Sequence, residues 1–174
     1  MTRRQLEHII RAAAATADVR DVVVIGSQAV LGAHPAAPAE LTQSVEADVF
    51  PKDDPKRSII IDGAIGEESL FHQTFGYYAH GVDQTTAVLP DGWEQRLVRV
   101  ENANTMGAVG WCIDVHDLAV SKLAAGREKD LLFVEAMLRH HFTDIHTIRQ
   151  RLLMTSNLQP AERERLSAIL DRWR

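Results

Sequence analysis

The sequence predicts an α/β protein with a mixed sheet, flanking helices and a helical C-terminal half. Short segments rich in β-branched and aromatic residues, separated by Gly, Pro and Asn, recur up to residue 114. From Val115 onward the pattern is helical. The chain has 174 residues, 45% of them hydrophobic, and shows no internal repeat or linker, so it can bury one core. We therefore expect an α/β core over residues 1–114 and a helical part over residues 115–174 that packs on it.

A helix and a buried strand open the chain. Leu6, Ile9 and Ala13 recur at helical spacing, which predicts a helix over about residues 3–17 that packs on the sheet. Residues 21–25, Asp-Val-Val-Val-Ile, are typical of a buried strand because nearly all of them are apolar and β-branched. The first strand of the sheet is therefore expected directly after the helix.

Gly26 and Ser27 follow that strand, and residues 27–31 are typical of the opening of a short helix. A glycine at the turn lets the backbone come close to a ligand. Ser27 stands where free amide groups at a helix start can hold phosphate oxygens. We therefore expect Gly26 and Ser27 to bind the phosphates of a nucleotide.

A pair of acidic residues, Glu46 and Asp48, lies two positions apart on the next expected strand. Side chains two apart on a strand share a face, so the acids project together while Val45, Ala47 and Val49 face the opposite way, toward the core. Neighbouring carboxylates repel unless a cation lies between them or one is protonated. Mg²⁺ and Mn²⁺ prefer oxygen ligands and commonly bridge protein carboxylates and nucleotide phosphates. The pair predicts a divalent metal site that the substrate completes.

The rest of the chain alternates between turn signals and periodic segments. Asp54-Pro55 starts a helix that Gly66 ends. Four later segments are strand-like in composition: residues 75–82, 85–89, 96–100 and 110–114. Helical patterns then predict four helices: residues 115–125, 128–140, 144–154 and 160–173. These elements would complete the sheet and form the helical C-terminal half.

Composition and charge narrow the class of protein. A single cysteine, Cys112, excludes an intramolecular disulfide and suits a reducing compartment. Without an apolar N-terminal segment or a stretch of membrane-spanning length, a cytoplasmic protein with no membrane partner is expected. The formal net charge of -5 argues against broad adhesion to nucleic acid. Six basic residues of the C-terminal half could hold a triphosphate or an RNA end if they converge near the acids: Lys122, Arg127, Lys129, Arg139, Arg149 and Arg151.

The order of these elements resembles the nucleotidyltransferase superfamily that includes DNA polymerase beta. There, a strand, a Gly-Ser turn and a helix precede a second strand with paired acids, as in Gly26-Ser27 and Glu46-Ala47-Asp48. Residues 117–130, Asp-Leu-Ala-Val-Ser-Lys-Leu-Ala-Ala-Gly-Arg-Glu-Lys-Asp, resemble the downstream motifs of the AbiEii and MenT type of bacterial toxin and of related uncharacterised proteins. The resemblance spans about residues 20–135. It implies a nucleotidyltransferase-type mixed sheet.

The resemblance implies catalytic roles for Glu46, Asp48, Lys122 and Asp130. Glu46 and Asp48 would hold Mg²⁺ or Mn²⁺ against an NTP, and Lys122 would neutralise charge on the triphosphate. Asp130 would orient the lysine, contact the metal or accept a proton from the attacking hydroxyl. An acid near a helix start also has a structural reading, because it complements the helix dipole. Arg127 and Lys122 would join the Gly-Ser turn in binding the nucleotide.

The implied reaction moves an NMP from an NTP to an RNA, such as a tRNA 3′ end, or to a protein side chain. The toxin resemblance also implies a cognate antitoxin. The chain departs from the family pattern at Glu46, where the toxins usually carry Asp, and in its third carboxylate, for which Asp62, Glu67 and Asp83 are the candidates. These departures favour a second hypothesis, a catalytically inactive nucleotidyltransferase-like binding module.

Two smaller patterns belong to other classes of site. Cys112 and His116 are four residues apart, which is half of a zinc site. Arg139 and His146 have the rough spacing of an arginine-histidine ribonuclease site on a helix, but residues 142–144 look like a break between helices. The ribonuclease hypothesis therefore requires one helix where the pattern indicates two.

Aromatic side chains offer surfaces on which a base can stack. Aromatic residues are only 6% of the chain, and a sheet of this size needs them to fill its core. Phe71, Phe75 and Tyr77 are therefore expected in the core. Trp93 follows Pro90-Asp91-Gly92 and is the aromatic residue expected to be exposed.

Overall fold

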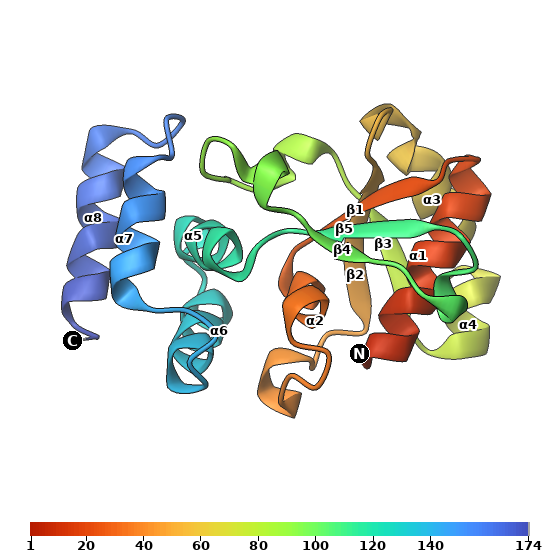
Figure 1. Cartoon of the computed structure of the whole chain (residues 1–174), viewed down its shortest axis with the longest axis horizontal. Helices are drawn as coiled ribbons and strands as arrows, with labels where there is room; N and C mark the ends of the chain where they lie inside the picture. The colour runs from red at the N-terminus through yellow and green to blue at the C-terminus, as the bar shows by residue number, and fades with distance from the viewer. Residues whose placement is uncertain (174) are drawn as a thin grey trace.

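A five-stranded mixed sheet forms the centre of the α/β part. In the computed structural model, which describes residues 1–173, the strand order is β3-β2-β1-β5-β4 (Figure 1). The strands are β1 (Asp21–Ile25), β2 (Glu46–Pro51), β3 (Tyr78–Gly81), β4 (Val98–Val100) and β5 (Val109–Cys112). β1 runs antiparallel to β2 and parallel to β5, β2 runs parallel to β3, and β4 runs antiparallel to β5. The expected mixed sheet is confirmed.

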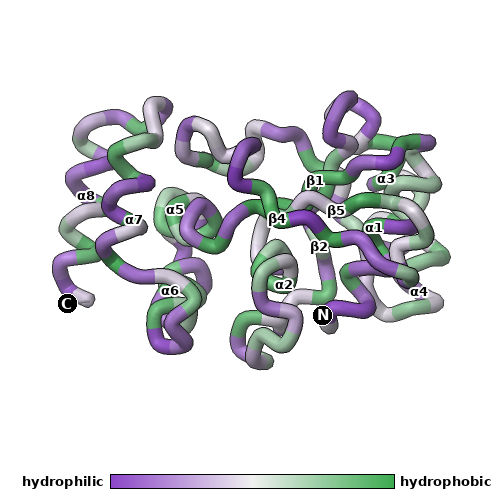
Figure 2. Tube along the Cα trace, viewed as in Figure 1, coloured by the Kyte–Doolittle hydropathy of each residue, from purple (hydrophilic) through white to green (hydrophobic). Residues whose placement is uncertain are grey.

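Helices flank the sheet and build the C-terminal half of the chain. The N-terminal half contains α1 (Arg3–Ala17), α2 (Val30–Ala33), α3 (Ser58–Ile65) and α4 (Leu70–Phe75). The C-terminal half contains α5 (Val115–Ala125), α6 (Glu128–Arg139), α7 (Ile145–Leu153) and α8 (Pro160–Asp171). Hydrophobic and hydrophilic residues alternate along α7 and α8 (Figure 2), as expected for helices with one buried side. Across residues 1–173, no helix is long and apolar enough to cross a bilayer.

Small residues let α1 and α2 approach one face of the sheet closely. A Cβ on Gly110 of β5 would lie 2.3 Å from the side chain of Ile10 of α1. A Cβ on Gly32 of α2 would lie 2.5 Å from Cβ of Cys112. Gly110 and Cys112 are two apart on β5 and therefore share a face. Both helices cover that face.

Glu46 and Asp48 project from the other face of the sheet. Ala47 and Val49 are buried, with exposed fractions of 1% and 0%, as expected for the core side of β2. The prediction that Val45 is also a core residue is wrong, because this residue is 47% exposed. Val45 precedes the first residue of β2 and lies at the end of the sheet. The buried side of the strand therefore begins at Ala47.

The prediction of a strand over residues 85–89 is wrong. Residues 84–86 form a single 3-10 turn instead. The Asp83 carboxylate accepts a hydrogen bond from the backbone N–H of Thr85 at 2.8 Å and another from its hydroxyl at 2.7 Å. This local cap outweighs the β-propensity of two adjacent threonines.

The strand predicted over residues 75–82 is shorter than expected. The hydroxyl of Ser69 accepts from the N–H of His72 and caps α4, which continues to Phe75. Gly76 ends this helix in the left-handed conformation, with φ of 74°. β3 begins only at Tyr78. The residues before it form a short helix, which the aromatic composition of this segment did not predict.

The Arg139 and His146 side chains lie on different helices, because Asp144 caps the start of α7. Arg139 pairs with Glu40 at 2.8 Å. His146 instead contacts the side chain of Gln150, one turn along α7. The single helix that the ribonuclease hypothesis requires does not form.

A buried carboxylate connects three segments of the chain. The side chain of Asp117 on α5 is fully buried and accepts a hydrogen bond from Nε of Arg96 at 2.8 Å. Arg151 of α7 lies 3.2 Å from the other oxygen of the same carboxylate. Arg96 also donates to the carbonyl oxygens of Pro90 and Asp91. Asp117 therefore fixes the loop that carries Trp93 against α5 and α7.

Candidate nucleotide site

The end of β1 brings a glycine turn against one of the paired acids. Ile25 lies opposite Asp48 in the β1–β2 register, and Gly26 follows with φ of 70°. A Cβ at Gly26 would lie 2.1 Å from Oδ2 of Asp48. Any larger residue at this position would displace the carboxylate, so the absence of a side chain at Gly26 is what allows the two to be adjacent.

Two side chains of β3 contact the paired acids of β2. The register places Tyr78 beside Glu46 and His80 beside Asp48. The Tyr78 hydroxyl donates to Oε2 of Glu46 at 2.9 Å, and Nδ1 of His80 lies 3.0 Å from Oδ1 of Asp48. Burial raises the pKa of Tyr78, and the hydrogen bond to Glu46 raises it further. Each acid therefore has a partner on the neighbouring strand.

The two acids repel each other. Burial raises the pKa of Asp48, and the charge of Glu46 raises it further, whereas His80 and Lys122 oppose the shift. A cation beside the carboxylates would relieve this cost. Two oxygen ligands of this kind fit a Mg²⁺ or Mn²⁺ ion that takes its remaining ligands from phosphates and water. Within residues 1–173, no group of three or more His, Cys, Asp and Glu side chains is arranged to hold a metal by itself.

The junction between α5 and α6 presents two cations over one buried acid. Lys122 donates to Oδ1 of Asp130 at 3.1 Å, and Nε of Arg127 donates to Oδ2 at 2.5 Å. The Asp130 side chain is only 1% exposed. Burial alone would raise the pKa of Asp130, but the hydrogen bonds and charges of Arg127 and Lys122 hold it below its ordinary value. Gly126, with φ of 67°, makes the turn that allows this geometry.

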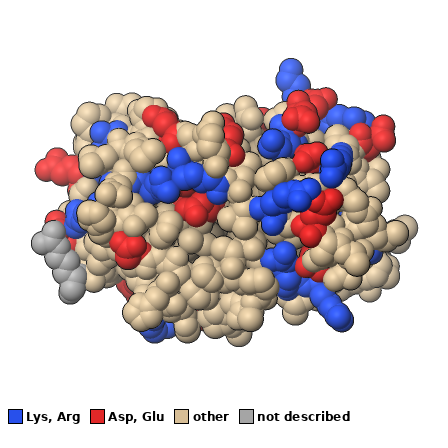
Figure 3. Space-filling model, in the orientation of Figure 1, with Lys and Arg blue, Asp and Glu red and all other residues tan. Residues whose placement is uncertain are grey.

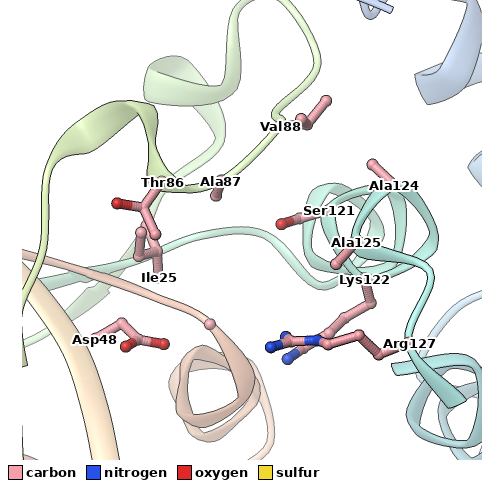
Figure 4. A pocket seen from close by; sticks show the side chains of 11 residues that line it. Ile25, Asp48, Thr86, Ala87, Val88, Ser121, Lys122, Ala124, Ala125 and Arg127 are labelled. Carbon is pink, nitrogen blue, oxygen red and sulfur yellow. The ribbon is translucent and has the colours of Figure 1, made fainter. Parts of the chain in front are cut away.

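A cavity of about 180 Å³ lies between the sheet and these cations. Gly26 and Asp48 line one side, and Lys122 and Arg127 line the other. In Figure 4 the carboxylate of Asp48 points across this space toward the two cationic side chains, while residues 86–88 lie above it. The pKa of Arg127 is raised, first by Asp130 and further by the charges of Asp48 and Glu46. The cavity therefore joins a carboxylate and two cations that are 74 or more residues apart in sequence.

The structure separates the sequence-predicted residues into those at the cavity and those behind it. Glu46 lies beside Asp48 but is bound by Tyr78 and does not line the cavity. Ser27 begins the 3-10 turn Ser27–Ala29 and does not line it either. Asp130 is covered by the two cations, so it contacts neither the cavity nor the acids of β2. Its carboxylate binds Lys122 and Arg127 instead.

Several site residues were missed by the sequence analysis. Tyr78 and His80 alternate on a strand that composition had indicated, but their pairing with β2 depends on the register of the sheet. Ser121 precedes Lys122 on α5, and its hydroxyl faces the cavity in Figure 4. The sequence predicts the helix that contains Ser121, but it does not show which part of the protein packs against that side of the helix.

The candidates for a third carboxylate do not join the paired acids. Asp62 accepts a hydrogen bond from the N–H of Gly81. Asp83 is used in capping the turn of residues 84–86. Glu67 contributes charge near Tyr78, but it forms no metal-binding group with Glu46 and Asp48.

The basic residues of the C-terminal half do not gather at the cavity. Arg149 pairs with Asp171, Arg151 with Asp117, and Arg139 with Glu40. On the face of the molecule in Figure 3, basic and acidic side chains are interspersed. Lys122 and Arg127 are the members of that predicted group that line the cavity.

Zinc is not supported by the Cys-His pair. Cys112 is fully buried against the helices, and burial raises the pKa of its thiol to about 12. Nδ1 of His116 lies 2.8 Å from the hydroxyl of Thr143. Cys112 therefore serves the packing of the core, and His116 has a hydrogen-bond partner within the protein.

The arrangement as a whole defines a class of protein. A mixed sheet that sets a Gly-Ser turn beside paired carboxylates, opposite a lysine and an arginine, is consistent with a nucleotidyltransferase fold. The family model described as "Nucleotidyltransferase of unknown function (DUF6036)" matches residues 4–174, and the chain belongs to this family. The match includes α7 and α8, which lie beyond the motifs in the sequence. The narrower resemblance to the AbiEii and MenT toxins is not confirmed. No match was found among curated proteins or among solved structures.

Proposed function

We propose that this protein is a metal-dependent nucleotidyltransferase that moves an NMP from an NTP to an acceptor and releases pyrophosphate. One observation supports this most directly. Asp48, held against the Gly26 turn, faces Lys122 and Arg127 across a single cavity. A carboxylate that can share a metal with phosphates, opposite two cations that can neutralise them, is a suitable environment for a triphosphate.

The proposed reaction assigns a role to each side of the cavity. Mg²⁺ or Mn²⁺, held by Glu46 and Asp48, would supply charge neutralisation and orientation at the α-phosphate. The backbone at Gly26, with Ser27 behind it, holds the outer phosphates. The oxygen of an acceptor hydroxyl forms a bond to the α-phosphorus as the bond to the bridging oxygen breaks, and the hydroxyl proton passes to water. Lys122 and Arg127 stabilise the negative charge that develops on the leaving pyrophosphate.

Asp130 is a positioning residue in this proposal. It is buried and hydrogen-bonded to both Lys122 and Arg127. Because its carboxylate fixes the two cations, less conformational entropy is lost when they bind phosphate. This support differs from a role as metal ligand or proton acceptor, since those roles require contact with the reacting atoms.

The acceptor and the biological setting are proposed from the sequence resemblance. The acceptor would be an RNA, such as a tRNA 3′ end, or a protein side chain. The protein would act in the cytoplasm as the toxin of a toxin-antitoxin pair, with a cognate antitoxin as its partner.

A second candidate is a catalytically inactive nucleotidyltransferase-like binding module. Two observations favour it: Glu46 is bound by Tyr78, and the residues 1–173 provide no third carboxylate to complete a metal group. Such a module would bind an NTP with Mg²⁺ but would not transfer it. Turnover, rather than binding, therefore separates the two candidates.

Label transfer tests the proposed function. Wild type and Asp48→Asn are incubated with Mg²⁺ or Mn²⁺, each of four α-labelled NTPs, and total cellular RNA plus protein. Label on RNA or protein that appears with wild type and not with Asp48→Asn is expected, and the labelled fraction identifies the acceptor class. No transfer with any metal or NTP would favour the binding module.

A further inference from the structure

A second cavity of about 250 Å³ adjoins the nucleotide cavity, and Ala87 lines both of them. Sites for small ligands commonly have volumes of about 300 Å³ or more. With about 180 Å³ in the first cavity, neither reaches this size alone, but together they exceed it. An elongated ligand that crosses residues 86–88 would use both.

The two cavities differ in charge. The first has two cations, Lys122 and Arg127, and one acid, Asp48, in its wall. Among the described residues that line the second, there is no Lys or Arg, and Glu94 is its charged residue. The first cavity therefore offers phosphates two cations, whereas the second offers them none and suits an uncharged group.

The lining of the second cavity suits a flat ring with polar edges. Leu89 and Trp93 provide apolar and aromatic surface, and Trp93 is partly buried against the core. Gln84 and Asn157 add two amide side chains, each with donors and an acceptor. An aromatic surface with amides at its rim is the combination that binds a nucleobase by stacking and by hydrogen bonds to its edge.

The loop that carries Trp93 is held in place by hydrogen bonds. The backbone N–H of Trp93 donates to the carbonyl oxygen of Pro90 at 3.2 Å. The neighbouring Asp91 donates its N–H to the carbonyl of Met154 at 2.8 Å, and its carboxylate accepts from the hydroxyl of Ser156 at 2.8 Å. These contacts join the Trp93 loop to the end of α7. A surface fixed in this way loses little entropy on binding.

We infer that the second cavity is the base subsite of the nucleotide, with the base stacked on Trp93 and its edge contacted by Gln84 and Asn157. The triphosphate then lies in the first cavity. This inference rests on the proposed function, because it takes the ligand to be an NTP. An RNA acceptor strand fits the second cavity less well, because its phosphodiesters would lie beside Glu94 without a cation in the lining.

Calorimetry with two ligands tests the subsite. NTP analogues with a non-hydrolysable α,β-bridge and inorganic tripolyphosphate are each titrated, with Mg²⁺, into wild type, Trp93→Ala and Trp93→Phe. Trp93→Ala is expected to weaken analogue binding about 10- to 100-fold, the range of one lost base stack. Tripolyphosphate binding is expected to be unchanged. Trp93→Phe keeps a ring and is expected to keep most of the analogue affinity.

Fluorescence gives a second reading that needs no substitution at Trp93. In a Trp111→Phe, Trp173→Phe background, the NTP analogue is expected to change the emission of Trp93, whereas tripolyphosphate is not. Unchanged emission together with wild-type affinity in Trp93→Ala would overturn the base subsite. Equal loss of both ligands in both Trp93 variants would also overturn it, because a base subsite at Trp93 predicts a loss of the analogue alone.

Lys122→Met separates this inference from the proposed function. The variant is expected to lose tripolyphosphate and analogue binding together, because both ligands need the phosphate site. Phosphate binding that depends on Lys122 but not on Trp93 would preserve the proposed function and remove the base subsite. A wild-type protein that binds neither ligand would overturn both.

Discussion

At the scale of single residues, the candidate site depends on how closely Gly26 and Asp48 approach. The positive φ of Gly26 is strained for other residues, and the space a Cβ would need is taken by the carboxylate. These are separate constraints. The first affects the stability of the turn, and the second affects the position of Asp48 in the cavity.

Gly26→Ala is therefore expected to lower transfer activity about 100-fold or more, since displacing a reacting geometry by about 1 Å can cost that much. Gly26 has φ of 70° and ψ of -170°, a conformation almost restricted to glycine, and the stability cost of alanine there is about 1–3 kcal/mol. Label transfer and urea unfolding measure the two effects.

Gly76→Ala is a control for the effect of a positive φ alone. Gly76 also has a positive φ, 74°, but its ψ of 11° is in the left-handed helical region, and a Cβ there would meet nothing within 4 Å. We expect a loss of stability of about 1–2 kcal/mol, no larger than that of Gly26→Ala, and no loss of transfer. Equal activity losses in the two alanine variants would show that strain, and not the contact with Asp48, determines the effect.

At the scale of elements, the α5–α6 junction and the Trp93 loop each depend on one buried carboxylate. Asp130 fixes Lys122 and Arg127 at the junction. Asp117 fixes Arg96 of the loop and Arg151 of α7. In both cases one acid faces two cations, so removing the acid leaves like charges close together.

Asp130→Asn is expected to lower the free energy of unfolding by roughly 2 kcal/mol at neutral pH, the typical value for hydrogen bonds to a charged group. The folded-state pKa of Asp130 lies below its ordinary value of 3.8, so its ionised form stabilises the fold above pH 3.8. This contribution is lost as the pH falls through the folded-state pKa. The difference between wild type and Asp130→Asn should therefore shrink below about pH 4.

Urea unfolding between pH 7 and pH 3 measures this difference. Glu128→Gln is the control, because Glu128 is an exposed acid in the same first turn of α6. Its effect should stay within about 0.5 kcal/mol at each pH. A difference for Asp130→Asn that does not change with pH would contradict the ion-pair account.

Asp117→Asn is expected to cost roughly 3 kcal/mol, because it leaves Arg96 and Arg151 partly buried without their acid. Glu101 is a matched surface acid, since it also pairs with two arginines, Arg20 and Arg99. Glu101→Gln should cost about 1 kcal/mol or less. Urea unfolding of both variants provides the comparison, and equal costs would show that burial of Asp117 adds nothing.

At the scale of the whole molecule, charge is distributed by pairing. Many arginines form ion pairs within the chain, and the formal net charge is -5. The cationic groups that matter for the proposal are Lys122 and Arg127, which share one buried acid, Asp130, and face the cavity. The molecule is thus arranged to attract phosphate at one place and not over a broad surface.

Generic duplex DNA is therefore expected to bind more weakly than about 10⁻⁴ M at physiological salt, the weak end of the usual nonspecific range. Fluorescence anisotropy with a labelled duplex, repeated over a series of salt concentrations, measures this. Micromolar binding with a steep salt dependence would show a basic surface that the observed ion pairs do not leave available.

Helices and strands with strong local signals were predicted well from the sequence. The first helix, the strand of residues 21–25 and the start of the C-terminal helices all lie where apolar periodicity or a run of β-branched residues placed them. The predictions failed where composition and local capping disagree, as at residues 84–86 and in α4. There, one or two side-chain hydrogen bonds decide the conformation, and their partners are settled by the geometry of the turn.

The sequence by itself determined the class of the fold, the Gly-Ser turn, the two acids on one face of β2, and the lysine and arginine followed by an aspartate. Each of these is a local pattern whose spacing fixes which side chains share a face. Only the tertiary structure decided that Asp48 faces Lys122 and Arg127, that Tyr78 and His80 bind the acids, and that Asp130 lies beneath the cations. These relations depend on the register of the strands and on where α5 packs. Both are determined by contacts between residues that are distant in sequence.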